Sequence, residues 1–405
     1  MRNLGKLCKS LVLYFFPFIA ILLCLFSKET SNAARNAVYL CLDVVIPSLF
    51  PFFVLSRMIV PFISGIRFPG FLKKITERFF RLPYYTLIII FFGFISGYPN
   101  GAKMTRDMFD RGLLDSRQAS RLLPVANNCS PLFIVGTVGA CLFKSVKLGM
   151  LLLLIHWVSG VIAAFIIGRL AGSRVCNGNY GKIVDIMHGK NQNNSQAVKN
   201  GRKNMAPDPE SLSVLIPLSV EEAALLCIKV SGYIILFAVI SELLARLGIF
   251  TLIGSVAASL LASENQGLQE FIAAFSKGII EITSGSQAVS SLKDTSLNIQ
   301  LSVVSLFFGF AGFSVHTQIM GIMKGTGCKY RVLFTGKLLH GIIAGIISFL
   351  ALHVMPMTVQ ASGADIAQGI GLSWTRPVVL LILILSLAVG PYRVSSLKKD
   401  SDKVR

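Results

Sequence analysis

The chain has 405 residues, of which 53% are hydrophobic and 14% are charged, and its mean hydropathy is +0.68. This balance excludes an ordinary soluble globular protein and predicts an all-α polytopic membrane protein, because a helix satisfies its own backbone hydrogen bonds inside a bilayer. The formal net charge of +20 comes mostly from loops between apolar runs. We therefore expect the basic residues to set the topology and to contact anionic lipid headgroups, and we expect no nucleic-acid partner.

The side chains that carry catalytic or metal chemistry form no recognised motif in this sequence. The eight cysteines and five histidines include no Cys-x-x-Cys and no His-Glu-x-x-His pattern. Neither a phosphate-binding loop nor a Ser/His/Asp arrangement is found. We therefore expect a protein that is not an enzyme and that needs no metal or other cofactor.

The N-terminal segment, 1–35, begins with basic residues and an apolar run. Arg2, Lys6 and Lys9 precede the run Leu11–Phe26, a pattern shared by signal peptides and by first membrane helices. No small-x-small cleavage site follows directly. The pattern therefore favours a retained transmembrane helix over a signal peptide.

The next segment, 36–170, contains a run that is too short to cross a bilayer. Tyr84–Ile95 has twelve residues, whereas a spanning helix needs roughly 20. A turn sequence, 96–103, follows it, so we expect a re-entrant hairpin over 84–110 whose tip lines a cavity. The other elements expected here are a span (36–63), a basic interfacial segment (65–83), a broken span (122–143) and a span (148–170).

A hydrophilic basic loop, 171–212, leads to a second segment, 213–354, with the same order of elements. This segment contains a span (223–247), a short piece (250–262), a hairpin (271–292), a broken span (301–323) and a span (332–353). The short run of the hairpin, Phe271–Ile282, ends in the polar sequence Thr283–Gln287. A last span, 378–391, and a basic tail form the C-terminal segment, 355–405.

The distribution of Lys and Arg predicts how these segments cross the membrane. Segments rich in Lys and Arg are assigned to the cytoplasm, namely both termini, 65–83, 103–121, 171–212 and 324–331. The less basic segments 27–35, 144–147, 263–300 and 355–375 are then outside. About eight transmembrane helices and two re-entrant hairpins satisfy this assignment. The two halves are then inverted repeats about 187 residues apart, in which Gly97 matches Gly285 and Asn128 matches Ser314.

Four motifs along the chain carry a family resemblance. They are Pro47-Ser48-Leu49-Phe50-Pro51-Phe52, Gly97-Tyr98-Pro99-x-Gly101-Ala102-Lys103, Asn127-Asn128-x-Ser130-Pro131-Leu132-Phe133 and Gly309-Phe310-x-Gly312-x-Ser314-Val315-His316-x-Gln318. The chain resembles, over nearly its whole length, the sporulation integral membrane protein family of endospore-forming bacteria (YlbJ/SpoVV type). The resemblance implies nucleoside-recognition gate domains and an architecture similar to that of concentrative nucleoside transporters. It also implies a role in sporulation, the transport of dipicolinic acid from the mother cell across the outer forespore membrane.

Polar groups at the two hairpin tips and in the two broken spans form the predicted substrate site. Such breaks free backbone groups near the bilayer midplane, and we expect a half-helix starting near residue 100 to direct unpaired N–H groups at the ligand. The candidates are Ser96, Gly97, Tyr98, Asn100, Lys103, Asn127, Asn128, Ser130, Ser284, Gly285, Ser286, Gln287, Ser314, His316 and Gln318. Glu281 and Asp43 are candidates for coupling or gating, and Glu281 is also a partner for Lys103 in an empty site.

Structural roles compete with these assignments. Lys103 also fits an interfacial lysine that snorkels, the Asn and Ser residues fit helix–helix contacts, and His316 fits a hydrogen-bonded packing residue. Asp43 and Arg57 lie within one span but about 21 Å of helix apart, so they do not pair locally. Their roles stay open at this point.

The predicted ligand follows from what the first hairpin lacks. The nucleoside transporters that the chain resembles hold a ribose with carboxylates on this hairpin, but no Asp or Glu lies between Arg78 and Arg106. Lys103 is present instead, which favours a small anion such as dipicolinate. The alternatives are a transporter of nucleoside-like or other small metabolites and a non-transporting scaffold for spore assembly. The resemblance adds an expectation of homo-oligomers, whereas the coupling ion and the direction of transport stay open.

Overall fold

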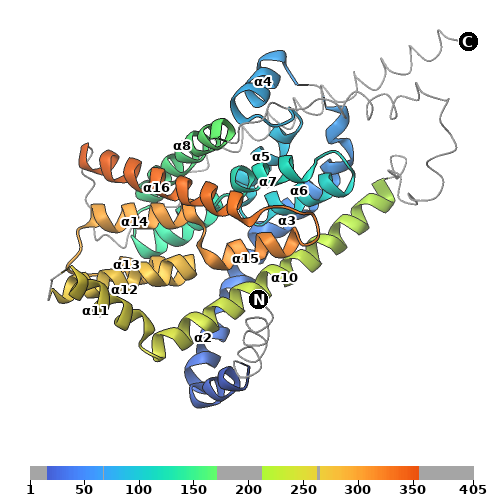
Figure 1. The fold of residues 1–405 in the computed structure, drawn as a ribbon. Helices are drawn as coiled ribbons and strands as arrows, with labels where there is room; N and C mark the ends of the chain where they lie inside the picture. Colours follow the sequence, from blue (N-terminus) through green and yellow to red (C-terminus); the bar gives the residue numbers. More distant parts are fainter. Residues whose placement is uncertain (1–15, 67, 171–211, 262–264, 355–405) are drawn as a thin grey trace, which may run out of the picture. The chain divides into compact units, whose positions relative to one another are not determined.

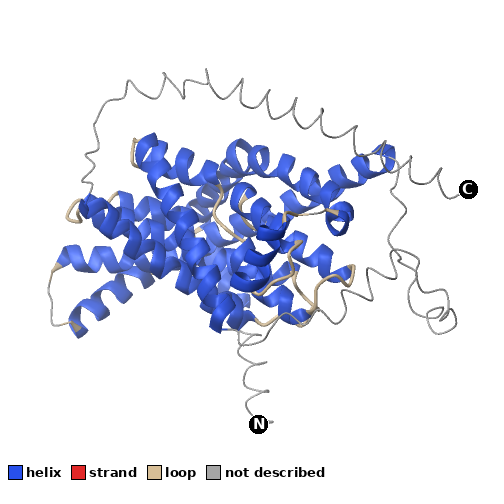
Figure 2. Ribbon diagram, turned by 90° about the horizontal axis from the view of Figure 1, so that it is seen from above, coloured by secondary structure: helices blue, strands red, loops and turns tan. Residues whose placement is uncertain are grey.

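The computed structural model describes residues 16–66, 68–170, 212–261 and 265–354, which form helices joined by short loops (Figure 1). Figure 2 shows the same arrangement from above, with helices throughout these ranges and no strand among them. Five helical segments are long and apolar enough to cross a membrane, namely Ser27–Ile63, Val146–Leu170, Ser213–Arg246, Leu297–Ile322 and Tyr330–Val354. The chain is therefore an all-α polytopic membrane protein, as its composition predicted.

The first set of elements begins with an unexpectedly long helical segment. The bounds are α2 (Ser27–Leu40), η1 (Cys41–Val45), α3 (Ile46–Ile59), η2 (Val60–Gly65), α4 (Gly70–Ile75), η3 (Thr76–Phe80), α5 (Thr86–Ser96), α6 (Asn100–Asp110), α7 (Ser116–Ala126), η4 (Leu132–Leu142) and α8 (Val146–Leu170). Residues 27–35, which we expected to separate two spans on the outer side, are helical and belong to α2, which continues into α3. Lys, Glu, Ala and Arg in α2 are strong helix formers, so a polar extension of the span is favourable.

The second set of elements starts with the long helix α10, which lies beside α2 and α3 (Figure 1). The bounds are α10 (Leu212–Arg246), α11 (Ile249–Leu260), α12 (Gln266–Ile280), α13 (Ile282–Ser290), α14 (Leu297–Phe310), α15 (Gly312–Ile322) and α16 (Tyr330–Val354). The helix α10 therefore begins before the predicted start of the span at residue 223. Residues 171–211 and the predicted last span, 378–391, lie outside the described residues.

The first hairpin consists of α5 and α6, joined at Gly97–Pro99 by a cis Tyr98–Pro99 peptide. Gly97 has a φ of +87°, in the region that glycine adopts without strain. A Cβ on Gly97 would also lie 2.7 Å from Cβ of Ser130. Glycine is thus required here both for the turn and for the close approach of the segment between α7 and η4.

The second hairpin, α12 and α13, turns at a different residue from the one predicted. Its break is at Glu281, which is extended, with φ of −144° and ψ of 123°. Gly285, the predicted match of Gly97, lies one turn inside α13 and packs on Gly278, since a Cβ on Gly285 would be 2.0 Å from Cα of Gly278. The second broken span likewise turns at Ala311, between α14 and α15, before Ser314. The order of elements repeats, but the predicted register of the repeat was off by about one turn.

Small residues allow the helices around the core to approach closely. Helices α14 and α16 pack along each other, and a Cβ on Gly309 would lie 2.5 Å from Cα of Gly341. Phe307 and Phe308 on α14 are fully buried in the hydrophobic cluster that α8, η4 and α16 also supply. This core holds the two broken spans in place beside the hairpins.

Candidate functional site

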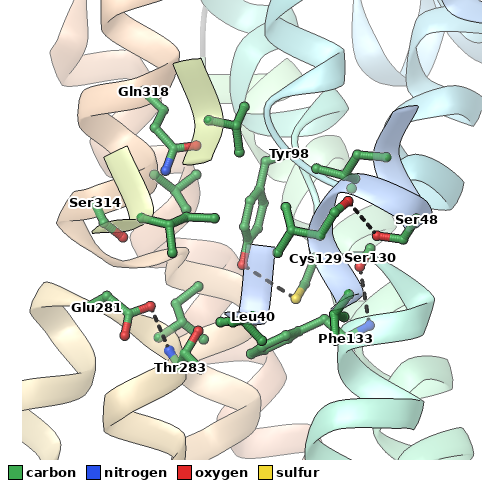
Figure 3. Close-up of a pocket in the computed structure, with 18 residues that line it drawn as sticks. Leu40, Ser48, Tyr98, Cys129, Ser130, Phe133, Glu281, Thr283, Ser314 and Gln318 are labelled. Carbon is green, nitrogen blue, oxygen red and sulfur yellow. Dashed lines mark hydrogen bonds between the residues drawn. The ribbon is translucent and has the colours of Figure 1, made fainter. Parts of the chain in front are cut away.

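Both hairpin tips and both broken spans contribute to one pocket, here called the inner pocket (Figure 3). Its volume is about 90 Å³. The polar or reactive residues that line it are Ser48, Tyr98, Cys129, Ser130, Glu281, Thr283, Ser314 and Gln318, and the lining also includes Gly97 and Phe133. Six of the predicted site residues, Gly97, Tyr98, Ser130, Glu281, Ser314 and Gln318, thus meet around one cavity.

Tyr98 occupies the middle of the inner pocket (Figure 3). Its hydroxyl donates to Sγ of Cys129 at 3.4 Å, and its backbone N–H donates to the carbonyl of Asn128 at 2.8 Å. Both bonds join the tip of the first hairpin to the irregular segment 127–130. Sequence reasoning found Tyr98 but treated Cys129 as a small hydrophobe, since a single cysteine carries no pattern.

Glu281 caps the start of α13 and does not contact Lys103. Its two carboxylate oxygens accept from the backbone N–H groups of Thr283 at 2.8 Å and Ser284 at 2.7 Å. A carboxylate at this position offsets the positive end of the helix. The positive end of α13 is therefore already satisfied by the protein, although one edge of Glu281 still faces the pocket.

The start of α6 is satisfied in the same manner, which corrects the expectation of unpaired N–H groups there. The side-chain oxygen of Asn127 accepts from the N–H of Ala102 at 2.9 Å, and the Asn127 amide donates to the carbonyl of Leu123 at 2.7 Å. Asn127 therefore caps α6 from the neighbouring break. Its side chain holds the hairpin rather than a ligand.

Polar side chains that remain available lie on α13 and α15. Thr283, Ser314 and Gln318 line the inner pocket, and no side-chain hydrogen bond of theirs is formed within the described part of the chain. Ser314 and Gln318 are four residues apart and share one face of α15, as their spacing predicted. These groups have free capacity to bind a polar ligand, as does the O–H of Ser130, whose oxygen accepts from the N–H of Phe133 at 3.2 Å.

His316 is on α15 but does not line the pocket. Its Nε2 lies 2.8 Å from the carbonyl of Phe310 and its Nδ1 lies 3.3 Å from the hydroxyl of Tyr330. Because protein groups occupy both ring nitrogens, the packing alternative describes His316 better than the ligand alternative.

The remaining candidates also have structural surroundings. Ser96, Asn100 and Ser56 form a buried chain of hydrogen bonds, in which Asn100 donates to Ser96 and accepts from Ser56, both at 2.9 Å. Six further candidates lie outside the inner pocket. Asn128, Gly285 and Ser286 are buried, Ser284 contacts Ser241, and Gln287 and Asp43 are exposed. The structure thus brings six of the seventeen predicted residues, about a third, to the inner pocket.

A wider, charged pocket adjoins the inner pocket at Val230 and Gln318, and we call it the vestibule. Its volume is about 650 Å³, and its charged lining residues are Lys103, Arg106, Asp107, Asp110, Glu222 and Lys229. Acidic and basic side chains therefore face the same space from α6 and α10.

An ion-pair network crosses the wall of the vestibule. Lys103 contacts Asp107 at 2.5 Å and Glu222 at 3.2 Å, whereas Arg57 contacts Glu222 at 2.8 Å and Asp107 at 3.8 Å. Burial raises the pKa of the Asp107 carboxyl, and the charges of Lys103 and Arg57 partly oppose that rise. This network joins α3, α6 and α10. The partners of Arg57 are therefore Glu222 and Asp107 rather than Asp43, which lies in the same helical segment.

Sequence reasoning missed the acidic members of this network and a buried basic group. Asp107 and Glu222 were not among the candidate residues, although both lie at helix positions from which they contact Lys103. Lys337 and His340 on α16 are buried within a spanning segment. Their spacing of three residues in an apolar run was a usable signal, because charges within a span are rare and usually functional.

Comparison with known proteins gives one informative similarity. The chain is 29% identical over 351 residues to the "Sporulation integral membrane protein YlbJ" of Bacillus subtilis (strain 168), which covers 85% of this chain and 83% of that protein. No family model matches the chain, and no solved structure matches it. The similarity agrees with the multi-pass integral membrane protein that the apolar helices indicate.

Proposed function

We propose that this protein transports dipicolinate, a small aromatic dicarboxylate, across the outer forespore membrane during sporulation. The observation that carries the proposal is the convergence of both hairpins and both broken helices on the inner pocket. Midplane sites built from interrupted helices are typical of secondary transporters. The sporulation context comes from the similarity to the Bacillus subtilis protein.

The lining of the inner pocket suits an aromatic ring that carries carboxylates. Tyr98 and Phe133 offer aromatic surfaces for a pyridine ring. Ser130, Ser314 and Gln318 offer hydroxyl and amide donors, and such bonds to charged acceptors each contribute about 1.5–3 kcal/mol. The carboxyl group of Glu281 is compatible with an anionic ligand because both of its oxygens accept hydrogen bonds from the backbone of α13.

The two pockets suggest how access alternates. Sites for small ligands are usually about 300–1,000 Å³, so the inner pocket is too small for such a ligand in this conformation, whereas the volume of the vestibule falls within that range. We assign the vestibule to the cytoplasmic side from the basic residues around it. An arriving carboxylate would compete with Asp107 and Glu222 for Lys103 and Arg57, and movement of the hairpins would then open the inner pocket.

The test is uptake of labelled dipicolinate by the full-length protein in liposomes, with uridine and unlabelled dipicolinate as competitors. We expect saturable uptake that dipicolinate inhibits and uridine does not. Gln318→Ala should lower the affinity about tenfold, the equivalent of one hydrogen bond to a charged group. Gln287→Ala is the matched control, since this exposed side chain lies outside the pocket.

The outcomes separate this proposal from its rivals. Inhibition by uridine would indicate the nucleoside-like class instead. Absence of uptake, together with normal sporulation when Tyr98 and Gln318 are replaced, would indicate a non-transporting scaffold.

A further inference from the structure

Lys337 is a fully buried lysine within a membrane-spanning helix, with no carboxylate partner among the described residues. Its Nζ donates to the carbonyl of Asn127 at 2.6 Å and lies 3.4 Å from Nδ1 of His340. His340 stacks on His156 of α8, with ring centroids 4.6 Å apart. We call these three side chains the lysine–histidine cluster.

Hydrogen bonding in the lysine–histidine cluster determines which nitrogens carry protons. The backbone N–H of Cys129 donates to Nε2 of His156 at 3.1 Å, so the proton of His156 is on Nδ1. Nε2 of His340 lies 3.1 Å from the carbonyl of His156, so it donates and leaves Nδ1 to accept from Lys337. Both imidazoles are therefore neutral in this conformation.

The surroundings of Lys337 suit an uncharged amine. Two acceptors, the Asn127 carbonyl and Nδ1 of His340, match the two N–H groups of a neutral amine. A protonated lysine has a third N–H, for which the described part of the chain shows no acceptor. An uncompensated charge in a dry interior is costly, so proton uptake by Lys337 requires the surroundings to rearrange.

The described helices packed on α16 supply no counter-charge. Helix α14 contains no ionisable side chain, and α15 contributes His316. Helix α7 carries Arg117 and Arg121, and α8 carries Lys147 and Arg169 besides His156, so all of these charges are positive. Cys129 lies in the break between α7 and η4. Two buried polar atoms near this break, Nδ1 of His156 and the side-chain oxygen of Asn128, have no hydrogen-bond partner among the described residues.

We propose that the lysine–histidine cluster is a proton-binding site that controls segment 127–130 and so couples proton uptake to binding of an anion in the inner pocket. Lys337 holds Asn127, and His156 holds Cys129, which with Ser130 lines the pocket. When Lys337 takes up a proton from solution, its amine has three N–H groups for two acceptors, so segment 127–130 and the pocket wall that it forms must shift. The proton also places a positive charge beside the site. The coupling rests on the proposed function, whereas the proton site does not.

A measurement without substrate tests the proton site. The conformation holds Lys337 neutral and the unfolded chain holds it charged, so the native state binds fewer protons and gains stability as pH rises. Thermal unfolding of the full-length protein in detergent from pH 6 to 9 should show this rise for wild type and for the exposed control Lys293→Met. The melting temperature of Lys337→Met should rise less with pH than that of wild type. If the Met variant does not fold, the same comparison is made with Lys337→Gln, which keeps a donor for the Asn127 carbonyl. Melting curves that shift in parallel for wild type and both variants would overturn the proposal.

A measurement with dipicolinate tests the coupling. In weakly buffered solution, wild type should take up protons when dipicolinate binds, and its affinity should change by up to about tenfold per pH unit. Lys337→Gln should bind without proton uptake and with a flat pH dependence. Proton uptake by Lys337→Gln equal to that of wild type would refute the coupling. If wild type did not bind dipicolinate but its melting temperature still rose more with pH than that of the Lys337 variants, dipicolinate would be refuted as the substrate and the proton site would stand.

Discussion

The hydroxyl of Tyr98 donates a hydrogen bond to Sγ of Cys129 at 3.4 Å and so ties the first hairpin tip to the break in the following span. The two residues are 31 positions apart in the chain and both line the inner pocket. A movement of the hairpin therefore alters the pocket wall directly.

Replacing Tyr98 separates the role of its ring from that of its hydroxyl. Tyr98→Phe keeps the aromatic surface and loses a weak bond to sulfur, so we expect less than about a threefold change in dipicolinate affinity. Tyr98→Ala also removes the surface on which a pyridine ring would stack, and should weaken binding at least about tenfold. Uptake kinetics in liposomes measure both effects. Equal affinities for the Phe and Ala variants would contradict a stacking role.

Removing the Glu281 carboxylate should affect both stability and transport. Loss of an N-terminal cap costs about 0.5–2 kcal/mol, so Glu281→Ala should lower the melting temperature and reduce uptake. Asn265→Ala removes the cap of α12, which is exposed and lies away from the pocket. This control should lose comparable stability but retain uptake. The gating role would be excluded if both variants transported equally well.

Neutralising Glu222 should make the vestibule more attractive to anions. Glu222→Gln leaves Lys103 and Arg57 with Asp107 as their remaining acidic partner. We expect the KM for dipicolinate to fall severalfold at low ionic strength and the difference to shrink in high salt. The matched control is Glu242→Gln, which removes the partner of Arg246 outside the vestibule. A higher KM for Glu222→Gln would show that the network serves packing rather than anion entry.

A methyl group between α14 and α16 should destabilise the fold. The Cβ of Gly309→Ala would lie 2.5 Å from Cα of Gly341, so the two helices must separate. We expect a loss of about 1–3 kcal/mol, as for other overpacked sites. Gly232→Ala in α10 is the control, because no atom lies within 4 Å of the added Cβ and the change should be neutral or stabilising. Equal melting temperatures for these two variants would contradict close packing at Gly309.

Local sequence features were enough to predict the membrane class and the position of the first hairpin. An apolar run of twelve residues cannot cross a bilayer, and the glycines and proline at 97–101 permit a reversal there. These conclusions depend only on local length and backbone chemistry. The prediction that Ser314 and Gln318 share one helix face also needed only local information, since it follows from their spacing of four residues.

Which polar groups face the inner pocket depends on how the helices pack against one another. The side chain of Asn100, at the first hairpin tip, accepts a hydrogen bond from Ser56 on α3. The ring nitrogens of His316 contact Phe310 and Tyr330, and Lys103 forms an ion pair with Glu222 on α10. The second hairpin turns at Glu281 because that carboxylate can cap α13. Lys337 reaches Asn127 across 210 residues of sequence. Partners this distant leave no periodic trace in the chain, since they depend on how separate helices pack.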